Sequence, residues 1–131
     1  MDIEYCTDAI AFYGDKLVLV ERLNNERGLA LPGGRCEKGE ALSDCIIREF
    51  AEETGLILAI DSTWSTYADP RRDPRGRKVT TVFAGCAYGV PRGEKGKTKV
   101  CFMNLSDIES LQERFAFDHF EIINDYLRSI S

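Results

Sequence analysis

The chain has 131 residues, of which 44% are hydrophobic and 30% charged, and this composition predicts one soluble globular domain over residues 1–131. Its net charge of −5 argues against a nucleic-acid-binding protein. No apolar run approaches the length of a membrane span, and the acidic start, Met1 to Glu4, is unlike a secretory signal. Five scattered cysteines without metal-ligand spacing indicate reduced thiols, so we expect a cytoplasmic protein that binds neither nucleic acid nor membranes.

The first part of the chain is predicted to form a β-hairpin followed by a loop. Residues 3–13 and 16–22 are rich in β-branched, aromatic and aliphatic side chains, and Gly14-Asp15 between them suits a two-residue turn. Residues 23–28 are polar and loop-like. Because Pro32-Gly33-Gly34 suits no regular element, we expect a loop to deliver the chain to the next segment.

The remainder predicts further strands and two more helices. Strands are expected over 56–67, 79–90 and 99–103, with a polar loop at 68–78 and a turn at 91–98. Ser106 and Glu109 have the spacing of a capping box at the start of a short helix. A last amphipathic helix is predicted over about 118–128, with an inward face formed by Phe120, Ile123 and Leu127. Strands occur both in hairpins and between helices, which favours an α/β fold with a mixed sheet covered by helices on both faces.

Residues 34–56 contain the most informative pattern, a glycine-rich loop followed by a short helix. Gly55 lies just beyond the last periodic residue, where a left-handed helix cap favours glycine. Glu49, Glu52 and Glu53 are three and four residues apart, so their carboxylates can converge on one patch. The opposite, apolar stripe of this helix is predicted to comprise Leu42, Cys45, Ile46, Phe50 and, at its edge, Ala51.

Converging carboxylates repel one another, and protonation or a divalent cation relieves that repulsion. Hard oxygen ligands without a histidine or cysteine set favour Mg²⁺, or Mn²⁺, over zinc. A solvated acidic helix face is the alternative, since such faces are common on soluble proteins.

The whole stretch resembles the signature of the Nudix hydrolases. That signature is Gly, five residues, Glu, seven residues, Arg-Glu, an apolar residue, any residue, Glu-Glu, any residue, Gly and an apolar residue. Every fixed position is met, by Gly34, Glu40, Arg48, Glu49, Phe50, Glu52, Glu53, Gly55 and Leu56. The resemblance implies an α/β/α sandwich and Mg²⁺-dependent hydrolysis of a nucleoside diphosphate linked to another moiety.

The same resemblance implies roles for the residues of the motif. Glu49 and Glu53 would be the principal metal ligands, and Glu52 and the Gly34 carbonyl would complete the site. Arg48 would orient the carboxylates, while Glu40 would contact the metal through water or brace the loop. The general base would be Glu53 or Glu52, or a glutamate from a later loop, for which the candidates are Glu94, Glu109 and Glu113.

A second informative stretch is basic in an otherwise acidic chain. Arg71, Arg72, Arg75, Arg77 and Lys78 lie within eight positions, with Pro70 and Pro74 stiffening the loop. Guanidinium groups bind phosphate oxygens bidentately, which favours an anion clamp over a loop that balances nearby acids. Substrate phosphates or the terminal ribose are therefore predicted to contact Arg22, Arg72 and Arg75.

A narrower resemblance is to the small ADP-ribose pyrophosphatases of the Nudix family. Pro70, which stands about fifteen residues beyond Gly55, marks this subgroup and its substrate site. The segments 72–77 and 115–119 also resemble runs found in its small bacterial and archaeal members. The chain departs from the subgroup at Leu29, where an aromatic residue is usual, and at Thr98 and Cys101, which replace a glutamate and a tryptophan.

ADP-ribose, split into AMP and ribose 5-phosphate, is thus the first predicted substrate. The alternatives are a house-cleaning hydrolase of nucleoside triphosphates, a pyrophosphatase of dinucleotides such as NADH, and a non-catalytic ADP-ribose sensor. Relatives of this type are often homodimers that share the substrate site. Packing or capping roles are predicted for Cys36, Cys45 and His119, and packing is favoured over adenine stacking for Trp64, Tyr67 and Tyr88.

Overall fold

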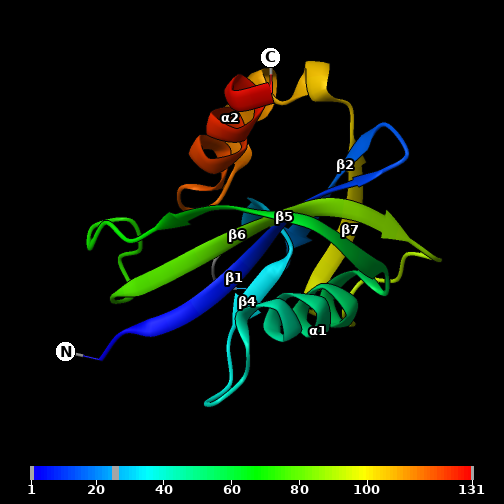
Figure 1. Ribbon diagram of the computed structural model, residues 1–131. Coiled ribbons are helices and arrows are strands. Elements are labelled where there is room, and N and C mark those ends of the chain that lie inside the picture. Colours follow the sequence, from blue (N-terminus) through cyan, green and yellow to red (C-terminus); the bar gives the residue numbers. More distant parts are fainter. Residues whose placement is uncertain (1, 25–26, 131) are drawn as a thin grey trace.

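The computed structural model describes residues 2–24 and 27–130, and within that part of the chain a seven-stranded sheet lies between two α-helices (Figure 1). The helices are α1 (Leu42–Thr54) and α2 (His119–Ile130). Two 3₁₀ helices, η1 (Leu105–Asp107) and η2 (Glu109–Arg114), precede α2. The strands are β1 (Glu4–Tyr13), β2 (Lys16–Arg22), β3 (Gly28–Ala30), β4 (Gly33–Arg35), β5 (Ile57–Tyr67), β6 (Lys78–Tyr88) and β7 (Thr98–Met103).

The sheet is mixed, as predicted. Its main path runs β3-β2-β1-β6-β5, while β4 also pairs with β1 and β7 also pairs with β2. Only the pairing of β1 with β6 is parallel among the described strand pairs. The predicted hairpin is confirmed, because Tyr13 pairs with Lys16 and Gly14 turns the chain with a φ of 64°. The start of the predicted loop 23–28 follows β2, and residues 25–26 lie outside the described residues.

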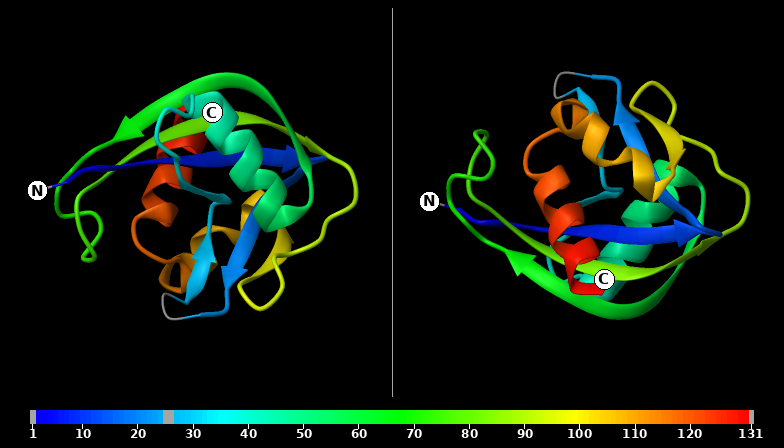
Figure 2. Two further views of the ribbon diagram at one scale, coloured as in Figure 1. Left: turned by 90° about the horizontal axis from the view of Figure 1, so that it is seen from below. Right: turned by 90° about the horizontal axis from the view of Figure 1, so that it is seen from above.

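Two hydrophobic cores, one on each face of the sheet, follow from the alternation of side chains along the strands. Ala9 and Ala11 of β1 face α1, where they join a cluster with Ile46 and Phe50. Ile10, between them, belongs to the opposite cluster that packs under α2. Figure 2 shows the two helices crossing opposite sides of the sheet. The sandwich of helix, sheet and helix predicted from the sequence is therefore confirmed.

The motif helix forms with the predicted cap and with a narrower apolar stripe. Cys45, Ile46 and Phe50 are buried, whereas the predicted stripe residues Leu42 and Ala51 are exposed. Both lie at the margin of the face that meets the sheet, so the prediction was wrong for them. Gly55 has a φ of 73° and donates its N–H to the Ala51 carbonyl, as a left-handed cap does.

Two local predictions were wrong. Gly33 and Gly34 are not loop residues, because they form β4 beside β1, and a Cβ at Gly33 would lie 2.0 Å from the Thr7 carbonyl oxygen. Glycine is what lets the two backbones approach so closely. No side chain caps the turn predicted at Ser106, since η1 begins after Asn104 and only 3₁₀ turns form there.

The last helix begins at His119 and buries Ile122 and Ile123, while Phe120 and Leu127 are partly buried against the same core. The inward face is therefore broader than the predicted set. Among the described residues, no helix is long and apolar enough to cross a membrane.

Candidate active site

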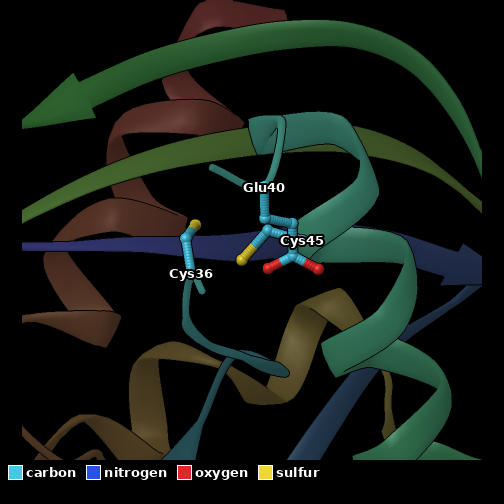
Figure 3. Close-up of side chains that lie close together, drawn as sticks. All are labelled: Cys36, Glu40 and Cys45. Carbon is cyan, nitrogen blue, oxygen red and sulfur yellow. The ribbon is translucent and has the colours of Figure 1, made fainter. Parts of the chain in front are cut away.

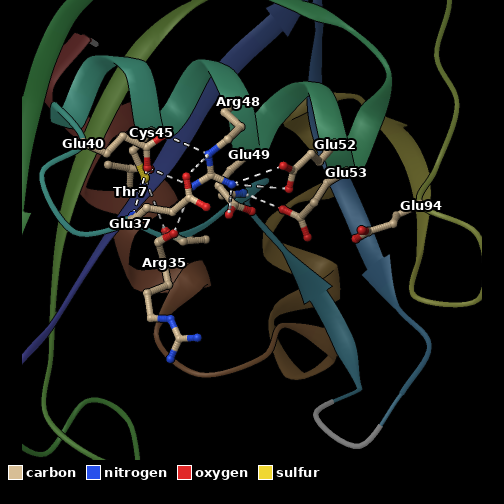
Figure 4. Close-up of polar contacts among 12 residues, drawn as sticks. Thr7, Arg35, Glu37, Glu40, Cys45, Arg48, Glu49, Glu52, Glu53 and Glu94 are labelled. Atoms are coloured by element: carbon tan, nitrogen blue, oxygen red, sulfur yellow. Dashed lines mark hydrogen bonds and ion pairs between the residues drawn. The ribbon is translucent and has the colours of Figure 1, made fainter.

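One arginine holds the carboxylates of the motif together (Figure 4). The Arg48 guanidinium donates from Nε and Nη2 to the two oxygens of Glu40, at 2.8 and 2.9 Å. Its Nη1 donates to Glu49 Oε1 at 2.8 Å and to Glu52 Oε1 at 3.2 Å. Arg48 thus links the loop before α1 to two turns of the helix, which is the orienting position predicted for it.

The charge of Arg48 sets the protonation of its closest partner. The hydrogen bonds from Arg48, and a second from the backbone N–H of Glu37, lower the pKa of Glu40 to about 2. The same contact with Glu40 raises the pKa of Arg48 above its already high ordinary value. Glu40 is therefore an ionised brace at neutral pH.

Glu53 lies deeper and on the side of α1 that faces β4. Its Oε1 accepts the Gly33 N–H at 2.7 Å. Burial raises the pKa of Glu53 from 4.5 to about 8, and the charges of Asp8 and Glu49 act in the same direction. Burial likewise raises the pKa of Glu49. Glu53 is therefore costly to ionise unless a cation lies beside it, whereas Arg48 already lies beside Glu49 and partly offsets the effect of burial there.

The contact between Gly34 and Glu49 forms the floor of this carboxylate group. A Cβ on Gly34 would lie 2.3 Å from Glu49 Oε2 and 2.5 Å from its Cδ, so no other residue type fits without displacing the carboxylate. Glu49, Glu53 and the backbone of Gly34 offer only oxygen donors, and Glu52 adds a half-exposed carboxylate beside them. This donor set fits Mg²⁺ or Mn²⁺, which prefer carboxylate and carbonyl oxygens.

A cavity of about 180 Å³ opens next to Glu53, and its lining includes cationic, acidic and aromatic residues. Arg22 and Arg75 line it, and both stack on the ring of Phe117, with guanidinium carbons 5.5 and 4.4 Å from the ring centroid. Phe117 has a φ of 51°, which is uncommon for a bulky residue and is typical of functional positions. Phe117 belongs to the run 115–119 that resembles the ADP-ribose pyrophosphatases, but no individual role was predicted for it.

Arg72 also lines the cavity, but its donors are engaged by protein groups. Its Nε and Nη2 donate to the Asp118 carboxylate at 2.7 and 3.1 Å, and its Nη1 donates to Thr80 Oγ1 at 2.7 Å. The Arg72 side chain is only 9% exposed. Its geometry is that of a buried ion pair that fixes the cavity wall.

A buried acid and the histidine form the end of the cavity. His119 Nδ1 accepts the Leu31 N–H at 3.1 Å and lies 3.8 Å from Asp8 Oδ2. Burial lowers the pKa of His119 to about 4 and raises that of Asp8 to about 7. A neutral His119 that accepts a backbone N–H confirms the predicted structural role.

Other predicted residues are distributed around this centre. Glu94 is drawn beside Glu53 in Figure 4, and the Thr98 hydroxyl donates to the Glu53 carbonyl at 3.1 Å while accepting the Glu94 N–H. Thr98 thus ties the Glu94 loop to the end of α1. Three of the predicted residues are exposed and do not line the cavity, namely Pro70, Glu109 and Glu113.

The aromatic candidates for adenine stacking lie elsewhere. Trp64 packs edge-on against Tyr126 with centroids 5.4 Å apart, and Tyr67 donates to Asp125 at 2.8 Å. Tyr88 is exposed on β6. The packing roles predicted for Trp64 and Tyr67 are confirmed.

Comparisons with known proteins agree with this arrangement. The family model described as NUDIX domain matches residues 6–126. An ADP-ribose pyrophosphatase of Methanocaldococcus jannaschii is 39% identical over 125 residues, which cover 92% of this chain and 71% of that protein. The NUDIX domain of Shewanella oneidensis NrtR, crystallised with ADP ribose, superposes with a TM-score of 0.87 at 26% identity and covers 100% of this chain and 90% of its own.

A larger relative has the same domain as one part. The bifunctional NMN adenylyltransferase/ADP ribose pyrophosphatase of Francisella tularensis, crystallised with AMP and manganese, superposes with a TM-score of 0.87 at 25% identity. The match covers 99% of this chain and 42% of that enzyme, so this chain spans less than half of its length.

Proposed function

Because the chain belongs to the NUDIX domain family and is a Nudix pyrophosphohydrolase, we propose that it hydrolyses ADP-ribose to AMP and ribose 5-phosphate with Mg²⁺. The observation that carries this proposal is the cavity, which is lined by Glu53 and Gly34 of the motif and also by Arg22, Arg75 and Phe117. A pyrophosphate needs both, namely a cation site at the bond that breaks and cationic contacts that hold the rest of the substrate.

The residues would divide the chemistry in the following way. Glu49 and Glu53, with the Gly34 carbonyl, would hold the divalent ion. Arg48, braced by Glu40, would keep Glu49 in place, and the Gly33 N–H would keep Glu53 in place. When bound, such an ion neutralises phosphate charge and lowers the pKa of water. Glu52 is 48% exposed beside the other carboxylates, and Glu94 faces them from the loop before β7. We propose that one of these two carboxylates accepts the proton of the attacking water.

Arg75 and Arg22 would bind the distal part of the substrate. Their guanidinium groups stack on Phe117 and line the cavity, so phosphate or ribose hydroxyl oxygens that enter it meet them directly. Arg72 would act by holding Asp118 and the wall, because its side chain is only 9% exposed, whereas Arg75, which pairs with Asp73, is 38% exposed. The relatives that bind or hydrolyse ADP-ribose support this choice of substrate.

A substrate panel tests the proposal. Purified protein with Mg²⁺ is supplied with ADP-ribose, NADH and deoxynucleoside triphosphates, and products are separated by anion-exchange chromatography. Preferential release of AMP and ribose 5-phosphate from ADP-ribose is expected. Faster turnover of a triphosphate would assign the house-cleaning alternative, and binding of ADP-ribose without turnover would assign the sensor.

A matched pair of arginines tests the cavity. Asp69-Pro70-Arg71 and Asp73-Pro74-Arg75 make the same local turn, but Arg71 is 89% exposed and does not line this cavity. Arg75→Ala should raise KM for ADP-ribose by about 10-fold or more, while Arg71→Ala should leave it near the wild-type value. Equal effects of the two substitutions would remove Arg75 from substrate recognition.

A further inference from the structure

Two thiols and a carboxylate lie close together between the motif loop and the start of α1 (Figure 3), and none of the three lines the cavity beside Glu53. Cys36 directly follows β4, Glu40 lies in the loop, and Cys45 lies in the first turn of α1. Their Sγ and carboxylate oxygen atoms all lie within 4.8 Å of one another. Cys45 Sγ also lies 3.1 Å from Thr7 Oγ1. Among the described residues, this is the only group of three metal-binding side chains whose donor atoms lie this close together.

We propose that Cys36, Glu40 and Cys45 form a second, regulatory metal site that binds a thiophilic divalent ion such as Zn²⁺ and lowers the activity of the enzyme. The site differs in chemistry from the carboxylates of Glu49 and Glu53. Thiolates select zinc-like ions, whereas an all-oxygen set selects Mg²⁺. The two sites can therefore be occupied by different ions from the same solution.

The spacing of the donors fits one tetrahedral ion. With Zn–S bonds of about 2.3 Å and Zn–O bonds of about 2.1 Å, neighbouring ligand atoms lie about 3.6 to 3.8 Å apart. The present separations of up to 4.8 Å therefore need to close by only about 1 Å. Cys36 and Glu40 line a surface hollow, which gives an ion access and leaves room for a water ligand.

The Cys36 thiol must lose its proton to bind a metal ion. Burial, with a contribution from Cys45, raises the pKa of Cys36 to about 12. A thiol of this kind is a poor nucleophile in the absence of metal, so it resists oxidation by peroxides or disulfides. A bound Zn²⁺ removes the proton from a coordinating thiol, so the elevated pKa reduces the affinity without preventing coordination.

Glu40 couples the second site to the first. Its carboxylate accepts both hydrogen bonds of Arg48 Nε and Nη2, and Arg48 in turn holds Glu49. An ion on Glu40 competes with the guanidinium for the same oxygens and repels its charge. Arg48 then no longer fixes Glu49 in position, and turnover falls.

Binding is tested with Cd²⁺, which gives an ultraviolet charge-transfer band when thiolates coordinate it. The titration is done in excess Mg²⁺ with wild type, Cys36→Ser and the control Cys86→Ser. Cys86 also has a carboxylate neighbour, Asp61 at 4.0 Å, but belongs to no group of three donors among the described residues. Wild type and Cys86→Ser should saturate at one equivalent, and Cys36→Ser should lose the band. A band of equal size in all three proteins, or no band in wild type, would overturn the site.

The inhibition assay rests on the proposed function, but the Cd²⁺ titration does not. A failure of the proposed function can therefore be distinguished from a failure of the metal site. Cys36→Ser should turn over substrate near the wild-type rate and should need at least about tenfold more Zn²⁺ for half-inhibition. Cys86→Ser should be inhibited like wild type. Stoichiometric Cd²⁺–thiolate binding with unchanged turnover of the wild type would refute the coupling through Glu40.

Discussion

Replacement of Glu53 by glutamine should abolish activity and at the same time stabilise the metal-free protein. In the wild type the Gly33 N–H donates to Glu53 Oε1 at 2.7 Å. The amide oxygen of glutamine can accept the same hydrogen bond, so the substitution removes only the charge. The pKa of Glu53 is about 8 in the folded protein and 4.5 ordinarily, so the folded state binds the proton more tightly than the unfolded state. Protonated Glu53 therefore contributes its full stabilisation of the folded state below pH 4.5, and this stabilisation is lost as the pH rises through 8.

The magnitude follows from the size of that difference. At about 1.4 kcal/mol per pKa unit, ionisation of Glu53 costs the folded state at most about 5 kcal/mol above its pKa of about 8. Relaxation around the site reduces this value, so we expect Glu53→Gln to gain about 2 to 4 kcal/mol in the free energy of unfolding at about pH 9. At about pH 5 the two proteins should differ by less than about 1 kcal/mol.

Urea denaturation in the presence of a chelator measures the free energy of unfolding at the two pH values, and kcat with Mg²⁺ measures the catalytic loss. Glu52→Gln is the matched control, because Glu52 is 48% exposed and its neutralisation should not produce a comparable gain at high pH. Added Mg²⁺ should stabilise the wild type far more than Glu53→Gln, because the ion binds the ionised carboxylate. A variant that is less stable than wild type at about pH 9, or that turns over normally, would refute the reasoning.

Three further substitutions test other parts of the site. Gly34→Ala places a Cβ 2.3 Å from Glu49 Oε2, and we expect kcat to fall by about 100-fold with little change in the melting temperature measured by circular dichroism. Arg48→Lys keeps the charge but loses the fork geometry, so isothermal titration should show about tenfold weaker Mg²⁺ binding, and wild-type affinity would contradict the bracing role. Asp118→Asn leaves Arg72 buried without its counter-charge and should cost about 3 to 5 kcal/mol in denaturant unfolding; a loss below about 1 kcal/mol would mean that the pair is not structural.

Local patterns in the sequence were sufficient to predict most of the fold. The β1–β2 hairpin follows from a two-residue turn between apolar runs, and the end of α1 follows from Gly55, because each depends on residues that are neighbours in the chain. The strand at Gly33-Gly34 was not predicted, because its pairing with β1 depends on a contact with Thr7 that lies far away in sequence.

In the candidate site, too, some contacts follow from local spacing and others only from the fold. Helical spacing alone predicts that Glu49, Glu52 and Glu53 converge. In the structure Arg48 bridges Glu49 and Glu52, Glu53 accepts the Gly33 N–H, and the three carboxylates form no group with donor atoms within 4.8 Å among the described residues. Spacing could not show that the Cys36 and Cys45 thiols approach each other, because their separation in sequence matches no known metal-binding motif. The homodimer predicted from the family resemblance stays a prediction, which sedimentation of the purified protein would test.

The two Asp-Pro-Arg turns of the basic loop show why substrate recognition depends on tertiary structure. In each turn the aspartate accepts the backbone N–H and the guanidinium of the arginine two residues later, so local sequence gives Arg71 and Arg75 the same geometry. Only Arg75 meets an aromatic ring, because Phe117 is brought to it from the far end of the chain.

The position of that ring depends on β3 and the residue that follows it. The Ala116 N–H donates to the Leu29 carbonyl at 2.8 Å, and the Leu31 N–H donates to His119 Nδ1 at 3.1 Å. These two bonds bracket Phe117 and hold it at a φ of 51°, with its ring against Arg75. On the proposed function, the anchoring of residues 115–119 would therefore set the specificity for the distal part of the substrate, while the charge of the loop would attract the substrate without selecting its position.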